Sequence, residues 1–341
     1  MTKWEIKKLF KNKSLIISSI IILLLCGIMS IFKPELEVER SYINENGKYV
    51  EDNRDTDIIA NEKLLSKVEQ IKELKLQGNG KNVDASTKEI SKISSEKLKK
   101  DEGKEYKDIS FYQVFNYRAS NFLVGFIISG IIVYIFSNIY TDEKLSNADS
   151  IILSSKNKNN ALLSKLYLSI ILPILIYFVY LIIIGGITAI QYGLPQNGEL
   201  QAYRIIQSFI MLKAISINTY TMLNIATMTI IFISIGVFSS LFSFITRNSV
   251  ESIVCITTFI IIGKLLTIIK FLPKELLIVS GYSNYIDIFM TPQTLIGNYL
   301  GIINIFGTTV SISNLVYVVL LGVVIIGIIL NIYVFKKILS K

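Results

Sequence analysis

The chain has 341 residues, of which 51% are hydrophobic, with a mean hydropathy of +0.52 and a formal net charge of +9. This composition is typical of a membrane protein and excludes an ordinary soluble domain. The charge does not indicate a nucleic-acid partner, because segment 33–117 has a net charge of −2 and the remaining chain, rich in apolar stretches, has +11. We therefore expect contact with membrane lipid and no nucleic acid.

Six apolar stretches are long enough to cross a hydrocarbon core of about 30 Å as helices. They predict an all-α polytopic membrane protein with both termini on one side. The expected spans are Ser14–Phe32, Asn121–Tyr140, Leu166–Ile190, Thr221–Phe244, Ser252–Phe271 and Leu315–Phe335.

Lysine and arginine side chains predict the orientation. They concentrate before the first span, between the second and third, after the fourth, and at the C-terminus. Because positively charged flanks resist translocation, we expect both termini in the cytoplasm. We expect a multi-pass protein of a bacterial cell membrane. Residues 1–13 then form an amphipathic interfacial helix, 14–32 the first span, 33–118 an extracellular segment, and 119–341 the other five spans.

The extracellular segment has two expected helices. Leu64, Val68 and Ile71 share one face between a cap at Asp57 and a stop at Gly78. A second helix begins at "STKE", where Ser86 and Glu89 have capping-box spacing. A helical hairpin and a mobile charged linker are both consistent with this pattern.

Two later exported loops, at about 201–218 and 274–306, are too apolar to be solvated and too interrupted to span. We expect short extracellular or re-entrant helices there, with an extra pair of spans as the alternative for the second loop.

Polar groups at membrane depth are few. The six predicted spans contain no Asp or Glu, which disfavours a carrier that depends on a buried carboxylate. Lys264 is expected either to snorkel to the interface or to line an internal pathway. Asn224, Thr227 and Ser234 of the fourth span are candidates for the same translocation path.

Residues and motifs typical of catalysis are also few. The chain has no histidine and no G-x-x-x-x-G-K-[ST] motif, so we expect no P-loop ATPase, no catalytic site and no cofactor or metal site in this chain.

The connector "TDEKLSNADSIILSSKNKNNALLSKL", residues 141–166, predicts a short cytoplasmic helix at about 145–156. Ser146 and Asp149 have capping-box spacing, and Leu145, Ala148 and Ile152 lie on one face. Such a face can lie on lipid or enter a groove on a partner protein.

The whole chain resembles the membrane subunit of type-2 ABC exporters. The likeness rests on the lysine-rich start "KWEIKKLFKNK", the large external segment, the connector "TDEKLSNADSIILSS" and Lys165 at the opening of the third span. The resemblance implies a permease that pairs with a second permease subunit, identical or related, and with cytoplasmic ABC ATPase subunits that bind ATP and Mg. It implies that the connector helix couples to the ATPase, through Asp142, Glu143, Asp149, Ile152, Ser154, Lys156 and Lys165. The chain departs from the family in having "SNAD" and "KNKNN" where glycine and arginine are common.

The expected function is thus ATP-driven export of an amphipathic or apolar cargo, such as an antimicrobial or self-made peptide or a lipid-like compound. Subunits of a sodium exporter, a sensor of extracellular ligands and a structural scaffold are the alternatives.

Overall fold

The computed structural model describes residues 2–11, 13–39, 41–43, 49–78, 84–101, 105–207, 209–269, 273–305 and 308–339. Within these ranges, six helices are long and apolar enough to cross a membrane, which confirms the prediction of an all-α polytopic membrane protein. They are α2 (Ser14–Ile31), α6 (Phe122–Ser137) with its continuation into α7 (Thr141–Leu145), α9 (Lys158–Tyr192), α10 (Ile217–Ile245), α11 (Ser249–Leu266) and α14 (Ile312–Leu339).

The helix boundaries differ most from the predicted spans at two places. Helix α9 begins at Lys158, eight residues before Leu166, because the polar stretch before the apolar run also folds as helix. Helix α11 ends at Leu266 instead of Phe271. Lys264 consequently lies in the last turn of a helix and not in the interior of a span.

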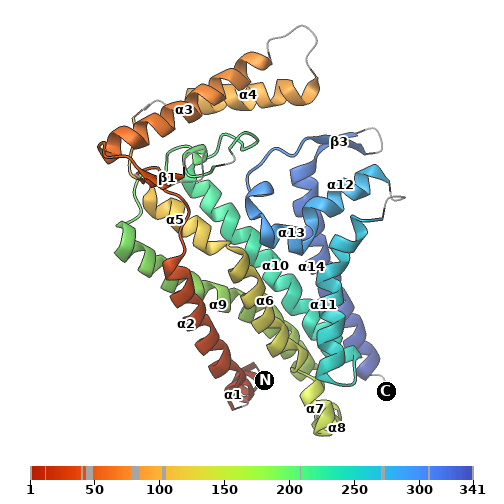
Figure 1. Cartoon of the computed structure of the whole chain (residues 1–341). Coiled ribbons are helices and arrows are strands. Elements are labelled where there is room, and N and C mark those ends of the chain that lie inside the picture. Colours follow the sequence, from red (N-terminus) through yellow and green to blue (C-terminus); the bar gives the residue numbers. More distant parts are fainter. Residues whose placement is uncertain are drawn as a thin grey trace.

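Helix α10 is the central helix and packs against α6, α9, α11 and α14 (Figure 1). Its small residues allow this close contact. A Cβ atom on Gly236 would lie 2.5 Å from the backbone oxygen of Ser169 and 2.8 Å from Pro173 on α9, and one on Gly327 of α14 would meet Phe238 at 2.8 Å. Small residues permit such approaches in lipid, where apolar surfaces gain little by associating.

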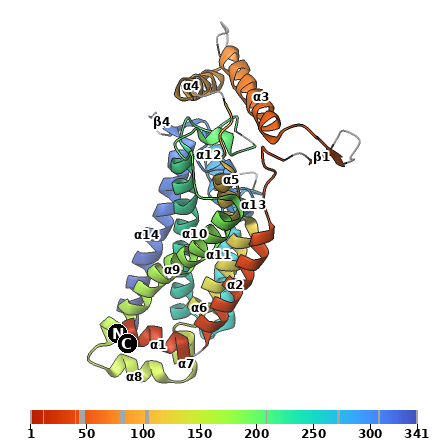
Figure 2. The same cartoon turned by 90° about the vertical axis from the view of Figure 1, so that its left-hand side faces the viewer.

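One end of the bundle carries α1 (Thr2–Lys11), α7 and α8 (Ala148–Ser154), together with both chain termini (Figures 1 and 2). Helix α1 lies across the bundle end, beside the start of α9 (Figure 2). The common side of the two termini therefore agrees with an even number of spans.

The opposite end carries two paired helices, α3 (Thr56–Gln77) and α4 (Ala85–Lys100), and a small antiparallel hairpin of β1 (Ser41–Ile43) and β2 (Tyr49–Glu51) (Figure 1). A helical hairpin, and not a linker without structure, thus forms within segment 33–118. Its buried face includes Leu64, Val68 and Ile71, as predicted.

The caps of these two helices were predicted wrongly. Asp55 and not Asp57 caps α3, and its carboxylate accepts a hydrogen bond from the backbone N–H of Asp57. Asp84 caps α4 by accepting from the N–H of Thr87, so the Ser86 capping box does not form. In both cases a carboxylate one or two residues upstream reaches the free N–H groups of the first turn.

Segments 201–218 and 274–306 form short elements and no further span within the described residues. They contain η1 (Ala202–Arg204), α12 (Lys274–Ser283), α13 (Tyr285–Met290), η2 (Pro292–Thr294) and the strand β3 (Ile302–Ile305). Strand β3 pairs in antiparallel fashion with β4 (Thr308–Ser311), which follows the second segment. The two segments bind each other, since Lys213 N–H donates to Gly297 and Tyr299 N–H donates to Met211. This pairing explains why both are apolar although neither spans.

Helix α5 (Ser110–Ala119) precedes α6, and its Arg118 is fully buried. The guanidinium donates to the backbone oxygens of Ser30 (2.7 Å) and Phe32 (2.9 Å) and to the side chains of Thr188 (2.9 Å) and Gln191 (2.7 Å). Arg118 therefore joins the end of α2 to the end of α9. Burial lowers the pKa of this guanidinium from its usual value, although arginine stays charged in proteins.

Candidate functional site

The connector between α6 and α9 is fixed to the end of α10. The Ser243 hydroxyl accepts hydrogen bonds from the backbone N–H groups of Tyr140 (2.9 Å) and Thr141 (3.2 Å). The Lys144 ammonium donates to the backbone oxygens of Phe244 and Thr246, each at 2.7 Å. These oxygens belong to the C-terminal end of α10, where a cation is favourable. Helix α7 is therefore held rigidly against α10.

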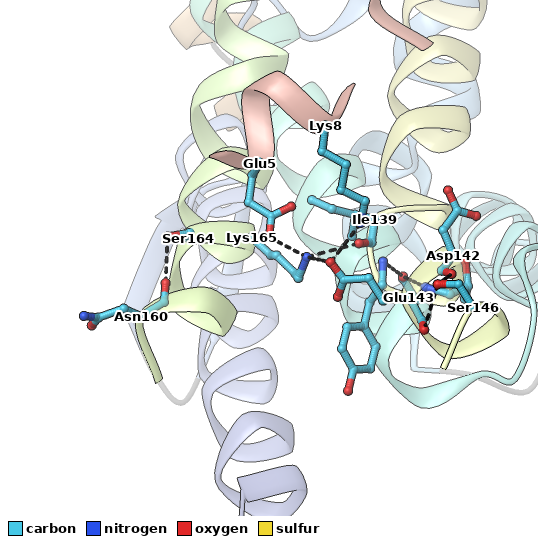
Figure 3. Close-up of polar contacts among 12 residues, drawn as sticks. Glu5, Lys8, Ile139, Asp142, Glu143, Ser146, Asn160, Ser164 and Lys165 are labelled. Carbon is cyan, nitrogen blue, oxygen red and sulfur yellow. Dashed lines mark hydrogen bonds and ion pairs between the residues drawn. The ribbon is translucent and has the colours of Figure 1, made fainter. Parts of the chain in front are cut away.

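A buried cluster of charges joins α7 to α9 and α1 (Figure 3). The Lys165 ammonium of α9 lies 2.7 Å from the Glu5 carboxylate of α1 and 2.6 Å from the Glu143 carboxylate of α7. Lys8 of α1 lies 2.8 Å from the same Glu143 oxygen. The side chains of Lys165, Glu5 and Glu143 are at most 3% exposed. We call these four residues, Glu5, Lys8, Glu143 and Lys165, the charge cluster.

The charge cluster is balanced, with two carboxylates and two ammonium groups. Buried ions require such pairing because water no longer solvates them. The Lys165 ammonium also donates to the backbone oxygen of Ile139 at 3.3 Å, whereas one Glu143 oxygen has no partner among the described residues. Removing any single member would leave a charge without full compensation.

Helix α8 begins differently from the prediction. Asn147 precedes it in the left-handed conformation (φ 54°), and no side chain caps the helix. The Ser146 hydroxyl donates to the backbone oxygens of Asp142 (2.8 Å) and Glu143 (3.2 Å), so it closes α7 instead of opening α8. The predicted capping box of Ser146 and Asp149 is therefore wrong. Asparagine suits this break because it adopts positive φ more readily than most residues.

The break at Asn147 also changes the apolar face of the connector. Leu145 and Ile151 are 65% and 72% exposed, whereas Ala148 and Ile152 are half-buried. The predicted face assumed one continuous helix from Leu145 to Ile152, and the two short helices do not keep that phase. Two large apolar side chains thus remain uncovered on the connector.

The predicted coupling residues fall into two groups. Glu143 and Lys165 are brought together inside the charge cluster. Asp142, Asp149 and Ile152 are half-buried on the connector, and Ser154 and Lys156 are exposed, with the Ser154 hydroxyl bonded to the backbone oxygen of Ile151.

Sequence reasoning missed Glu5 and Lys8 as members of this site. The available signal was a single acid, Glu5, among the five lysines of residues 3–13. A lone opposite charge in such a stretch indicates a partner elsewhere in the chain.

The candidate path residues each bind a neighbouring element. Asn224 donates to the backbone and side-chain oxygens of Asn116 at 3.2 and 3.3 Å. The hydroxyl of Thr227 lies 3.0 Å from that of Tyr317, and the hydroxyl of Ser234 lies 2.6 Å from that of Tyr285. These bonds partner buried polar groups between helices, although Asn224 Oδ1 has no partner among the described residues. A role in translocation stays a prediction.

Lys264 forms an ion pair with Asp287 of α13, at 2.8 and 2.9 Å from its two carboxylate oxygens. This contact differs from both predicted arrangements, because Asp287 belongs to the short helix that packs beside α11. The pair is partly exposed, with side-chain exposures of 44% and 35%.

Within the described residues, no group of three or more His, Cys, Asp or Glu side chains is placed to hold a metal ion. Comparison with protein families, curated proteins and solved structures finds no match to this chain.

Proposed function

We propose that the chain is the permease subunit of an ATP-driven exporter, and that a separate cytoplasmic ABC ATPase binds its connector. The observation that carries this proposal is the connector itself. It presents Leu145 and Ile151 to the outside while the charge cluster and Lys144 fix its base to the bundle. A surface that only covers the ends of spans needs no uncovered apolar side chains.

Orientation supports this assignment. The end that carries the connector also carries Lys3, Lys7, Lys11, Arg247 and Lys336. Such an excess of basic residues favours the cytoplasmic side, where ATP is present. The α3–α4 pair then lies outside the cell.

The charge cluster offers a route for force. Glu143 of α7 contacts Lys165 of α9 and Lys8 of α1, and Lys144 of α7 contacts the end of α10. A displacement of α8 would therefore be transmitted to three spans, α6, α9 and α10, and to α1. Packed helices transmit such displacements because their interiors are dense.

A second permease subunit is part of the proposal. Only 11% of the apolar window of α11 and 22% of that of α14 is buried inside the described chain. Either lipid or a second subunit can cover these faces, and a symmetric pair of permeases would present two connectors to two ATPase subunits. The absence of carboxylates deep in the spans supports an amphipathic or apolar cargo, such as a peptide, over a titrating ion carrier.

One observation favours a second candidate, a sensor of extracellular ligands. A cavity of about 420 Å³ opens between α3, α4 and Tyr203, and Lys72, Lys75 and Asp101 lie among its lining residues. Its size is within the usual range for small-molecule sites. In that case the connector would contact a signalling partner and not an ATPase.

The test is co-purification of the chain with an ABC ATPase encoded beside it. Leu145→Asp and Ile151→Asp should each lower the amount of bound ATPase about tenfold, because a desolvated carboxylate in an apolar contact costs more than 1.4 kcal/mol. Leu194→Asp is the matched control, since Leu194 is 73% exposed and follows the C-terminal end of α9, the end away from the connector. Equal ATPase recovery from all three variants would remove the connector from the binding surface.

A further inference from the structure

A cavity of about 430 Å³ lies at the end of the bundle that carries α3 and α4. Its walls come from α5, the start of α6, α10, the chain after α2, and the η2 turn with the last residue of α13. Figure 1 shows the α3–α4 pair above this end of the bundle, where α5 packs against α10. The volume is large enough for a short stretch of peptide or a small molecule.

The base of this cavity consists of carboxamide side chains with unused hydrogen-bonding groups. Gln113 and Asn121 are only 5% and 8% exposed. The Gln113 Nε2 donates to the backbone oxygen of Glu35 at 3.1 Å, which leaves Gln113 Oε1 without a partner among the described residues. The Asn121 Oδ1 accepts from Leu123 N–H at 3.1 Å, and its Nδ2 donates to no described residue. The cavity thus offers one acceptor and one donor that have no described partner, on side chains that are more than nine-tenths buried.

The rim of the cavity combines apolar and aromatic side chains with the exposed polar residues Glu35, Gln207 and Gln293. Tyr117, Phe122 and Met290 line it and are exposed. An acceptor and a donor at the base with apolar side chains at the rim match a peptide, whose backbone alternates donors and acceptors while its side chains point away.

The charge of the lining residues favours a peptide over a phospholipid headgroup as the ligand of this cavity. The lining residues include no lysine and no arginine, and their one charged member, Glu35, is acidic and lies 3.6 Å from Lys63. Phosphate groups are ordinarily bound by cations or by several N–H donors. Neither arrangement is present among the lining residues.

We infer that this cavity binds a short segment of an uncharged amphipathic peptide, with Gln113 and Asn121 recognising its backbone. The inference rests on the proposed function in that such a peptide would be the exported cargo, held at the outer end of the spans.

The experiment measures binding to the full chain, purified alone in detergent. The probe is a short fluorescein-labelled peptide amide of alternating leucine and asparagine, followed by fluorescence anisotropy. Gln113→Leu should raise its Kd about tenfold, the effect of one buried hydrogen bond. Because Gln113 also holds Glu35, a second variant is needed, and Gln293→Ala at the exposed rim should raise the Kd about threefold. Thr294→Val, a neighbouring exposed residue, should leave the Kd unchanged.

Three results would overturn the inference. The unaltered chain could show no saturable binding, the Gln113 and Gln293 variants could bind as tightly as the control, or phosphatidylglycerol could displace the probe while unlabelled peptide does not. The last result would assign the cavity to lipid. A matched probe of alternating leucine and aspartate should bind at least tenfold more weakly because the lining offers no cation, and equal affinity would also count against the assignment.

This experiment is independent of the exporter role. Probe binding by a chain that fails to recruit the ATPase would leave the cavity assignment intact and refute the proposed function. Recruitment of the ATPase without probe binding would do the reverse.

Discussion

Replacing Lys165 by methionine tests whether the charge cluster holds the connector end together. Lys165 is fully buried and pairs with Glu5 at 2.7 Å and Glu143 at 2.6 Å. In the variant, Glu143 keeps its contact with Lys8, but Glu5 loses its only ion-pair partner among the described residues. The change therefore leaves one carboxylate buried and uncompensated.

The expected cost follows from this geometry. Removing one partner of a buried ion pair usually costs about 3–5 kcal/mol, because the remaining charge is desolvated. For a chain of this size the entropy of unfolding is about 0.7 kcal/mol/K, so each kcal/mol corresponds to a fall in melting temperature of about 1.4 °C. We therefore expect Lys165→Met to lower the melting temperature in detergent by roughly 4–7 °C.

Two further variants separate charge from packing. The triple variant Glu5→Gln, Glu143→Gln and Lys165→Met removes the buried charges together, and it should recover at least half of the lost stability, since neutral replacements of whole ion pairs are often tolerated. Lys156→Met is the control for loss of an exposed lysine and should change the melting temperature by no more than about 2 °C.

Thermal unfolding followed by circular dichroism in one detergent measures all of these variants. A melting temperature for Lys165→Met within about 2 °C of the unaltered chain, the range expected for the Lys156→Met control, would refute the view that the cluster is structurally important. A triple variant less stable than the single one would show that packing, and not charge compensation, dominates.

Three other predictions concern single positions. Arg118→Lys should lower stability by about 3 kcal/mol in a chemical denaturation experiment, because one ammonium cannot reproduce the fork that binds α2 and α9, and an unchanged midpoint would contradict this. Gly236→Ala should lower the free energy of unfolding by about 1–3 kcal/mol through its clash with α9. Gly322→Ala, where the new Cβ meets nothing within 4 Å, should be neutral, and equal effects of the two substitutions on stability would argue against the packing explanation. Burial lowers the pKa of Lys97 on α4 to about 8 from 10.5. Between these two pKa values the unfolded chain binds more protons than the folded chain, so stability should rise from about pH 8 to pH 10.5. This slope in melting temperature should vanish in Lys97→Met, and a slope that persists would assign the pH dependence to another group.

The sequence was sufficient to predict the spans. Crossing a membrane requires a continuous apolar stretch of a set length, which is a local property of the chain. The same holds for α3, where Leu64, Val68 and Ile71 already mark the buried face by their spacing. The connector between the second and third spans holds two short helices, α7 and α8, where one was predicted, and α8 lies within the predicted range.

The local sequence pattern did not predict which residues cap the helices. Several side chains within a few residues can serve as a cap, as Asp55 and Asp57 do before α3, and the chosen one depends on the path by which the chain enters the helix. The Ser146 hydroxyl had suitable spacing to cap α8 but bonds backward into α7 instead. Its choice follows from the break at Asn147, which no spacing rule requires.

Only the tertiary structure decided which charges meet. Glu5 and Lys165 are 160 residues apart, and Lys264 pairs with Asp287 across the junction of α11 and α13. Arg118 likewise binds the ends of two helices that are distant in the sequence, α2 and α9. The sequence by itself determined which segments enter the membrane, because burial in lipid depends on the apolar content of each segment alone. The partners of the buried charges depend instead on how those segments pack, since a charge taken from water is stabilised by whichever opposite charge the fold brings within reach.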